Sequence, residues 1–151
     1  MLKDRQYLLA DSRLISRPRP QLWNIFSGNQ IFLVSLFNHP LGHGPAMTVC
    51  HFLPDRHSFR GSYGGKDVLP LYRNQVGTEP NLLTGLLDLL KDAYGKKVIP
   101  EDVAGYLYAV LAQPEYTRRF EKELTNRQIQ LRLARMYGIL AALFLMRSRL
   151  L

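Results

Sequence analysis

The feature that most constrains the fold is a change of hydrophobic pattern near residue 80. Before it, short apolar runs rich in β-branched and aromatic residues are separated by proline and glycine, which is typical of strands joined by turns. After it, apolar residues recur at the spacing of a helix, as in Leu83, Leu86, Leu87 and Leu90. The sequence therefore predicts an α+β fold, with a small β-rich N-terminal half followed by a helical C-terminal subdomain.

Three runs in the first half are strand candidates. Residues 31–37 and 46–53 are the best two, and a third short strand is expected at 68–72. Pro70 lacks the N–H group that a ladder needs, so the third strand should lie at an edge of the sheet or contain a bulge. Upstream of all three, we expect Trp23 to anchor the chain to the core.

Three helices are expected in the second half. The first carries the leucine stripe, with Asn81 as a candidate N-cap and Gly95 just past its end. The second begins at Pro100, which two acidic residues follow in the first turn. Pro114 ends the second helix and begins a third, which runs to Leu124. We expect these helices to pack together.

Length and charge limit the classes of function. A chain of 151 residues is long enough for one compact core. Its net charge of +8 favours an anionic partner such as nucleic acid, although an ordinary basic protein with solvated charges is the alternative. The single cysteine, Cys50, excludes an internal disulfide, and no apolar run approaches the roughly 20 residues that span a membrane. We expect a cytoplasmic protein with no membrane association.

One segment, residues 56–73, combines basic, aromatic and glycine residues. Arginine can pair bidentately with guanine, lysine can bind phosphate, and tyrosine can pack against sugar or base. A glycine turn without side chains would let its neighbours reach into a groove, whereas the alternative is a tight turn that only joins two strands. The segment predicts these DNA-binding residues: Arg56, His57, Arg60, Tyr63, Gly64, Gly65, Lys66 and Arg73.

The sequence contains no recognisable phosphate-binding loop, zinc-ligand motif or catalytic cysteine. The glycine cluster does not match the Walker phosphate loop, because Lys66 is followed by Asp67. The histidines and Cys50 match no standard zinc spacing. Cys50 also falls within an apolar strand candidate, where a thiol is usually inert. We therefore expect no catalytic residue, no cofactor and no metal.

Four segments in consistent order resemble the C-terminal specificity region of type ISP restriction-modification enzymes. They are residues 8–23, 59–73, 80–90 and 101–116. The resemblance covers residues 5 to about 124 and implies a target-recognition domain that reads double-stranded DNA. Enzymes of this family join nuclease, helicase-like ATPase, adenine-N6 methyltransferase and target-recognition parts in one polypeptide.

The resemblance also implies a domain organisation. Residues 1–125 form a specificity-like domain, with a β-rich basic part at 1–78 and a helical part at 79–125, and residues 126–151 form a divergent basic amphipathic tail. Methyltransferase, nuclease and ATPase motifs are missing, so we expect an isolated or truncated part of such an enzyme. Its partners would be double-stranded DNA and the catalytic domains of a larger or neighbouring polypeptide. Two alternatives stay open, a protein–protein interaction module and a degenerate fragment without independent function.

Overall fold

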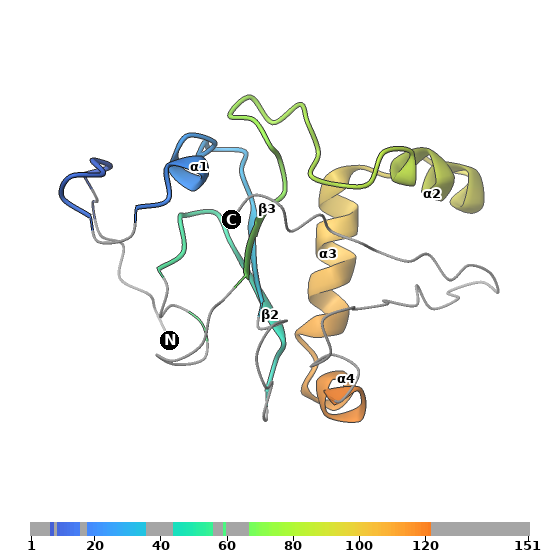
Figure 1. Ribbon diagram of the computed structural model, residues 1–151. Coiled ribbons are helices and arrows are strands. Elements are labelled where there is room, and N and C mark those ends of the chain that lie inside the picture. The colour runs from blue at the N-terminus through green and yellow to red at the C-terminus, as the bar shows by residue number, and fades with distance from the viewer. Residues whose placement is uncertain are drawn as a thin grey trace.

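In the described part of the chain, a three-stranded antiparallel sheet is followed by the helices of the C-terminal half (Figure 1). The computed structural model describes residues 7, 9–15, 18–35, 44–55, 59 and 67–121. The elements in chain order are α1 (Pro20–Trp23), β1 (Phe32–Ser35), β2 (Met47–Cys50), β3 (Asp67–Pro70), α2 (Leu86–Tyr94), α3 (Pro100–Leu111) and α4 (Pro114–Arg119). This arrangement confirms the predicted α+β class.

The strand order is β2-β1-β3, so β1 is the central strand. At one end of the sheet Phe32 lies between Cys50 and Pro70, and we call this row the Phe32 end. At the other end Ser35 lies between Met47 and Asp67, and we call this row the Ser35 end. β3 is an edge strand, as Pro70 predicts, because proline has no N–H group to offer a further strand.

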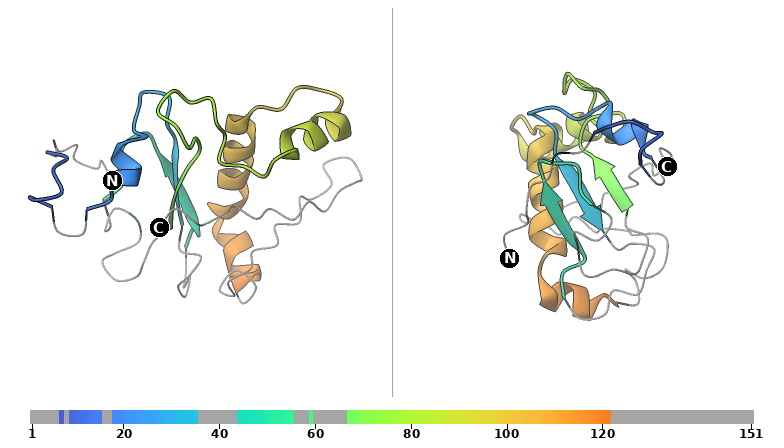
Figure 2. Two further views of the ribbon diagram at one scale, coloured as in Figure 1. Left: turned by 45° about the horizontal axis from the view of Figure 1, so that its top comes forward. Right: turned by 90° about the vertical axis from the view of Figure 1, so that its left-hand side faces the viewer.

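The sheet lies between α1 and α3, and all three strands can be followed face-on in Figure 2. All four residues of β1 are buried. Since successive side chains of a strand point to opposite faces, both faces of the central strand are covered. The backbone of β2 is tied to α3 at the Ser35 end, where the N–H of Ala46 donates to the carbonyl of Leu111 at 2.8 Å.

One hydrophobic core is shared by the sheet and two helices. It includes Leu33 of β1, Met47 of β2, Leu69 of β3, Leu90 of α2 and Leu107 of α3. Full burial of one such side chain contributes about 1.5 to 3 kcal/mol, so the helices are stabilised chiefly through this core. α3 therefore packs on β2 and on α4, while α2 joins the core through Leu86 and Leu90.

Trp23 does not belong to this core. It is the last residue of the four-residue helix α1, which has no buried residue, and it is only half-buried. The prediction that it anchors the chain to the core was wrong. A four-residue helix has room for little apolar contact, and the sheet is already filled by its own residues and those of α2 and α3.

The predicted second and third helices are confirmed in the described residues. α3 begins at Pro100, and the side chain of Asp102 accepts a hydrogen bond from the N–H of Ile99 at 3.0 Å. Proline at the first helical position and a carboxylate in the first turn suit the start of a helix, where backbone N–H groups lack partners. α4 begins at Pro114 but ends at Arg119, because Phe120 leaves the helical conformation with φ of −111° and ψ of 24°. The prediction that this helix runs on through Phe120 was wrong, and residues 122–124 lie outside the described residues.

The predicted cap of α2 was wrong. The helix starts at Leu86, after Gly85 has taken a left-handed conformation with φ of 83°. A positive φ interrupts the right-handed helical backbone, so the helix cannot extend back to Leu83 or Asn81. The end of the helix was predicted correctly, because Gly95 adopts φ of 66° and its N–H donates to the carbonyl of Lys91.

Candidate nucleic-acid interface

The structure places one of the eight residues expected to bind DNA. Arg73 is described, and it is exposed just beyond β3. The other seven lie outside the described residues: Arg56, His57, Arg60, Tyr63, Gly64, Gly65 and Lys66.

The two residues that bound the glycine turn are described, and both belong to the folded frame. Phe59 is 7% exposed and is a member of the core. Asp67 opens β3 and pairs with Ser35 of the central strand. Arg60 and Lys66 are thus each one peptide bond from a residue that the core or the sheet holds in place.

Arg73 begins a turn whose backbone is held by a side chain. The carboxamide oxygen of Asn74 accepts hydrogen bonds from the N–H groups of Gly77 and Thr78, both at 3.0 Å. Across the turn the N–H of Arg73 donates to the carbonyl of Glu79 at 2.8 Å. These bonds fix the backbone from which Arg73 projects.

A buried asparagine also holds the side chain of Arg73. The Nε of Arg73 donates to Oδ1 of Asn81 at 3.2 Å, and Nδ2 of Asn81 donates to the carbonyl of Pro70 at 3.1 Å. Asn81 is 4% exposed, so this support is rigid. Within the described residues the guanidinium makes no ion pair, which leaves its terminal N–H groups available to an anionic ligand. Sequence reasoning missed this role, because no pattern links an arginine with an asparagine eight positions away.

The residue before Arg73 connects the turn to α3. The hydroxyl of Tyr72 donates to Oε1 of Glu101 at 2.5 Å. Burial of Tyr72, then its hydrogen bond to Glu101 and the charge of that carboxylate, raise the pKa of the phenol to about 12. Tyr72 therefore stays protonated at neutral pH and keeps this connection to the first turn of α3.

Arg73 and Asp67, the described residue that follows the glycine cluster in the sequence, lie at opposite ends of the sheet. Asp67 pairs with Ser35 at the Ser35 end, while Arg73 follows Pro70 at the Phe32 end. At about 3.3 Å per residue, the paired part of β3 alone separates the two ends by about 10 Å. That is roughly three base-pair steps of B-DNA at about 3.4 Å each. Side chains at the two ends of β3 are thus spaced to contact different base-pair positions.

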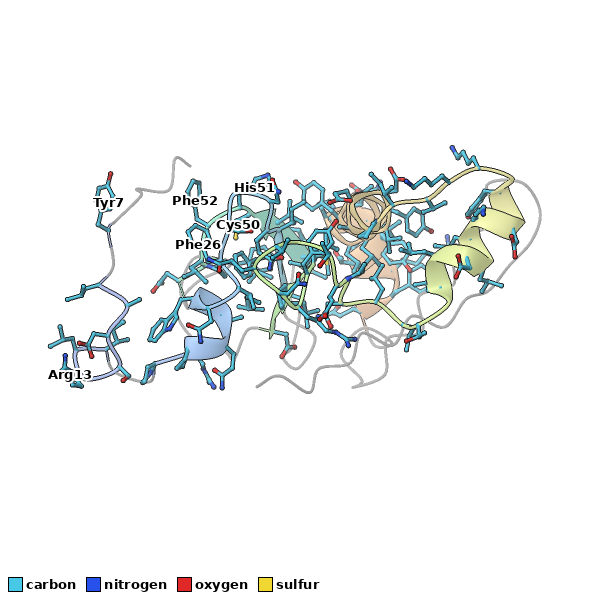
Figure 3. All side chains as sticks on the ribbon, turned by 90° about the horizontal axis from the view of Figure 1, so that it is seen from above. Tyr7, Arg13, Phe26, Cys50, His51 and Phe52 are labelled. Atoms are coloured by element: carbon cyan, nitrogen blue, oxygen red, sulfur yellow. The ribbon has the colours of Figure 1, made fainter. Side chains whose placement is uncertain are left out.

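Two aromatic side chains also lie at the Phe32 end of the sheet. Phe52 follows β2 and is 48% exposed, and its ring lies 6.4 Å from that of Phe26. Figure 3 shows both rings beside Cys50 and the exposed His51. The thiol of Cys50 donates to the carbonyl of Phe52 at 3.2 Å, which helps to hold this segment. A partly exposed aromatic ring provides a surface for sugar or base packing.

The described ranges contain neither a metal cluster nor a membrane helix. Among them, His, Cys, Asp and Glu side chains form no group of three that could hold a metal ion. Across the same ranges, no helix combines the length and the apolar character needed to cross a bilayer.

Comparison with known proteins supports the reading of the sequence. A family model described as the type ISP C-terminal specificity domain matches residues 4–136. The match covers most of the chain and extends past residue 124, where the sequence resemblance was expected to end. No curated protein and no solved structure matches the chain.

Proposed function

Because this chain belongs to the family of type ISP C-terminal specificity domains, we propose that it reads the base sequence of double-stranded DNA for a restriction-modification enzyme. The chain would select the target, without a catalytic step of its own. Methyl transfer to adenine and DNA cleavage would be carried out by domains of a larger or neighbouring polypeptide in the cytoplasm. The family match carries this proposal, and the net charge of +8 supports it.

The proposed mechanism separates contacts that set register from contacts that read sequence. Hydrogen bonds to phosphates orient a protein on the duplex, while side chains in a groove distinguish the base edges. We assign base reading to the glycine turn, with Arg60, Tyr63 and Lys66 as its principal residues. Attachment of this turn to Phe59 in the core and to Asp67 in the sheet supports the assignment, because base readout requires a positioned segment.

Arg73 is assigned a separate contact in this mechanism. Its guanidinium is exposed, and Asn81 restrains it through Nε. A restrained arginine loses less rotamer entropy on binding a phosphate or a guanine than a free one does. Its place at the Phe32 end would extend the footprint on DNA beyond the bases read by the glycine turn.

Selection from a pool of random duplexes tests the proposed function directly. The full chain should enrich a defined sequence, and its affinity for the enriched duplex should fall steeply with salt. Arg60→Ala combined with Lys66→Ala should weaken binding of the enriched duplex at least about tenfold, since one bidentate base contact contributes about 1 to 3 kcal/mol.

A matched control uses an arginine that already has a partner. Arg13 lies in a bidentate contact with Asp11, with Nη2 at 2.6 Å from Oδ2. Arg13→Gln should therefore leave duplex affinity unchanged. Absence of duplex binding by the unaltered chain would refute the proposed function, whereas unchanged binding by the Arg60 and Lys66 variant would refute only the assignment of the glycine turn.

A further inference from the structure

Helix α2 ends in an exposed segment that carries three lysines. Residues 91–97 are all exposed, and we call them the lysine tip. Its cations are Lys91, Lys96 and Lys97, and it contains one carboxylate, Asp92. The local charge is therefore positive, on a helix for which the sequence predicted only packing with its neighbours.

The three lysines make no ion pair or hydrogen bond through their side chains within the described residues. Asp88 and Asp92 lie one turn apart on α2 but do not pair with them. The C-terminal end of a helix carries about half a negative charge, which favours a nearby cation. The positive charge of three lysines is larger than the partial negative charge at the end of the helix.

The tip is held firmly although it is exposed. Leu86 and Leu90 of α2 are buried in the core, at 6% and 8% exposure. The N–H of Gly95 donates to the carbonyl of Lys91 at 2.8 Å, which closes the helix in a left-handed cap. The backbone that carries the lysines is thus anchored through the helix and its cap.

The helix that leads into the tip lies at the same end of the molecule as the turn that Arg73 begins. Figures 1 and 2 show α2 and the turn after β3 at the end of the molecule where α3 begins, while α4 lies at the other end of α3. Tyr94 in the tip is 46% exposed, so it adds an aromatic surface beside the cations. Basic and aromatic groups on one side of a fold are typical of a nucleic-acid footprint.

We propose that Lys91, Lys96 and Lys97 bind the phosphate backbone of the DNA whose sequence the domain reads. The inference rests on the proposed function and adds a contact that no base-reading residue provides. Lysine binds phosphate as a point charge without discriminating between bases. The lysine tip therefore contributes affinity and register, while sequence preference stays with the other contacts.

The test compares three forms of the full chain on the enriched duplex and on a scrambled duplex, over a series of salt concentrations. The first is the unaltered chain, and the second carries K91Q, K96Q and K97Q. The third is a control with R118Q and R119Q, two exposed cations of α4 at the other end of the molecule. All substituted residues are exposed, so the thermal midpoints should agree.

The salt slope is the decrease of the logarithm of the binding constant per unit of log salt concentration. This decrease should become smaller by about 2 to 3 in the lysine variant, because each neutralised phosphate contributes about 0.9. The ratio of affinities for the enriched and scrambled duplexes should stay the same within about twofold, as expected of a contact that carries no sequence information. If K91Q perturbs α2, the double variant K96Q/K97Q lies outside the helix and should still lower the slope by about 2.

Other outcomes separate the inference from the function on which it rests. If the unaltered chain binds no duplex, the proposed function and this inference both fail. If it binds and the lysine variant keeps the slope of the α4 control, only this inference fails. Unchanged duplex binding together with lost binding to phosphatidylserine vesicles would assign the lysines to a membrane surface instead, and would also overturn the inference.

Discussion

The side-chain amide of Gln30 bonds both backbone groups of Tyr72. Its Nε2 donates to the carbonyl of Tyr72 at 2.9 Å, and its Oε1 accepts from the N–H of Tyr72 at 3.0 Å. The same Nε2 donates to the carbonyl of Ile25 at 3.1 Å. Gln30 is 1% exposed, so these bonds are shielded from water. The side chain of Gln30 thus replaces the backbone hydrogen-bond partner that Tyr72 would have if the ladder between β1 and β3 continued to this position.

Gln30→Ala should lower the free energy of unfolding by about 3 kcal/mol. Two buried backbone groups of Tyr72 would lose their partner, and each such loss costs about 1 to 3 kcal/mol. Urea denaturation measures the change. Gln75→Ala is the control, because Gln75 is exposed and makes one long bond of 3.5 Å to Phe26, so its effect should stay within about 0.5 kcal/mol. Equal effects of the two changes would contradict the role of Gln30.

Tyr72→Phe should change how stability depends on pH. The folded pKa of Tyr72 is raised to about 12 from the ordinary value of 10.0, so the native state holds its proton more tightly than the unfolded state. Its contribution is complete below pH 10 and is lost as pH rises through 12. The unaltered chain should therefore lose about 2 to 3 kcal/mol more than the variant across this range. Denaturation at several alkaline pH values tests this, and a constant difference between the two chains would contradict it.

Two buried hydroxyl groups should respond in opposite ways to removal. The Oγ1 of Thr117 donates to the carbonyl of Gly44 at 2.8 Å, and Thr117→Val should cost about 1 to 2 kcal/mol. The Oγ of Ser35 is buried and has no hydrogen-bond partner among the residues that the structure describes, so Ser35→Ala should leave stability unchanged or raise it by about 1 kcal/mol. Thermal or urea unfolding of both variants measures the contrast, and a larger loss for Ser35→Ala would disprove it.

Arg73→Lys should weaken DNA binding nearly as much as Arg73→Gln. Lysine keeps the charge but has no equivalent of Nε, so it cannot keep the bond to Asn81 together with a two-pronged contact. We expect affinity for the enriched duplex to fall about threefold to tenfold. Arg19→Lys is a matched control, since Arg19 is exposed and its side chain makes no capping bond to α1. If Arg73→Lys kept the full affinity for the enriched duplex and only Arg73→Gln lost affinity, the charge alone would matter, which would contradict this prediction.

Much of the fold follows from local sequence. Residues 31–37 and 46–53 contain β1 and β2, because β-branched and aromatic runs bounded by breakers favour strands. The edge position of β3 follows from Pro70, and the starts of α3 and α4 follow from their prolines. These predictions succeeded because the determining chemistry lies within a few residues of each element.

The contacts that position the candidate site could not be predicted in this way. Asn81 has the chemistry of a helix cap, but it is placed by β3 to bond Pro70 and Arg73. Gln30 is one polar residue in a loop until Tyr72, forty-two positions away, is folded against it. Such roles depend on tertiary neighbours, which a single sequence does not reveal. The lysine tip was passed over for a related reason, because only the fold shows that α2 lies at the same end of the molecule as the turn of Arg73.

The order of the strands has a consequence for how such a domain diversifies. Residues 36–43 follow Ser35 in the sequence and residues 60–66 precede Asp67. The nearby described residues Ala46 and Asp67 are held by a backbone hydrogen bond to Leu111 and by pairing with Ser35, respectively. The hydrogen bonds from the side chains of Gln30 and Asn81 to the backbone lie at the opposite end of the sheet, the Phe32 end. Substitutions or insertions in these two segments should leave the strand register unchanged, since the register is set by pairing within the sheet and by the hydrogen bonds of Gln30 and Asn81. Under the proposed function, substitutions in residues 60–66 would change the target sequence while the strands and their register are inherited unchanged.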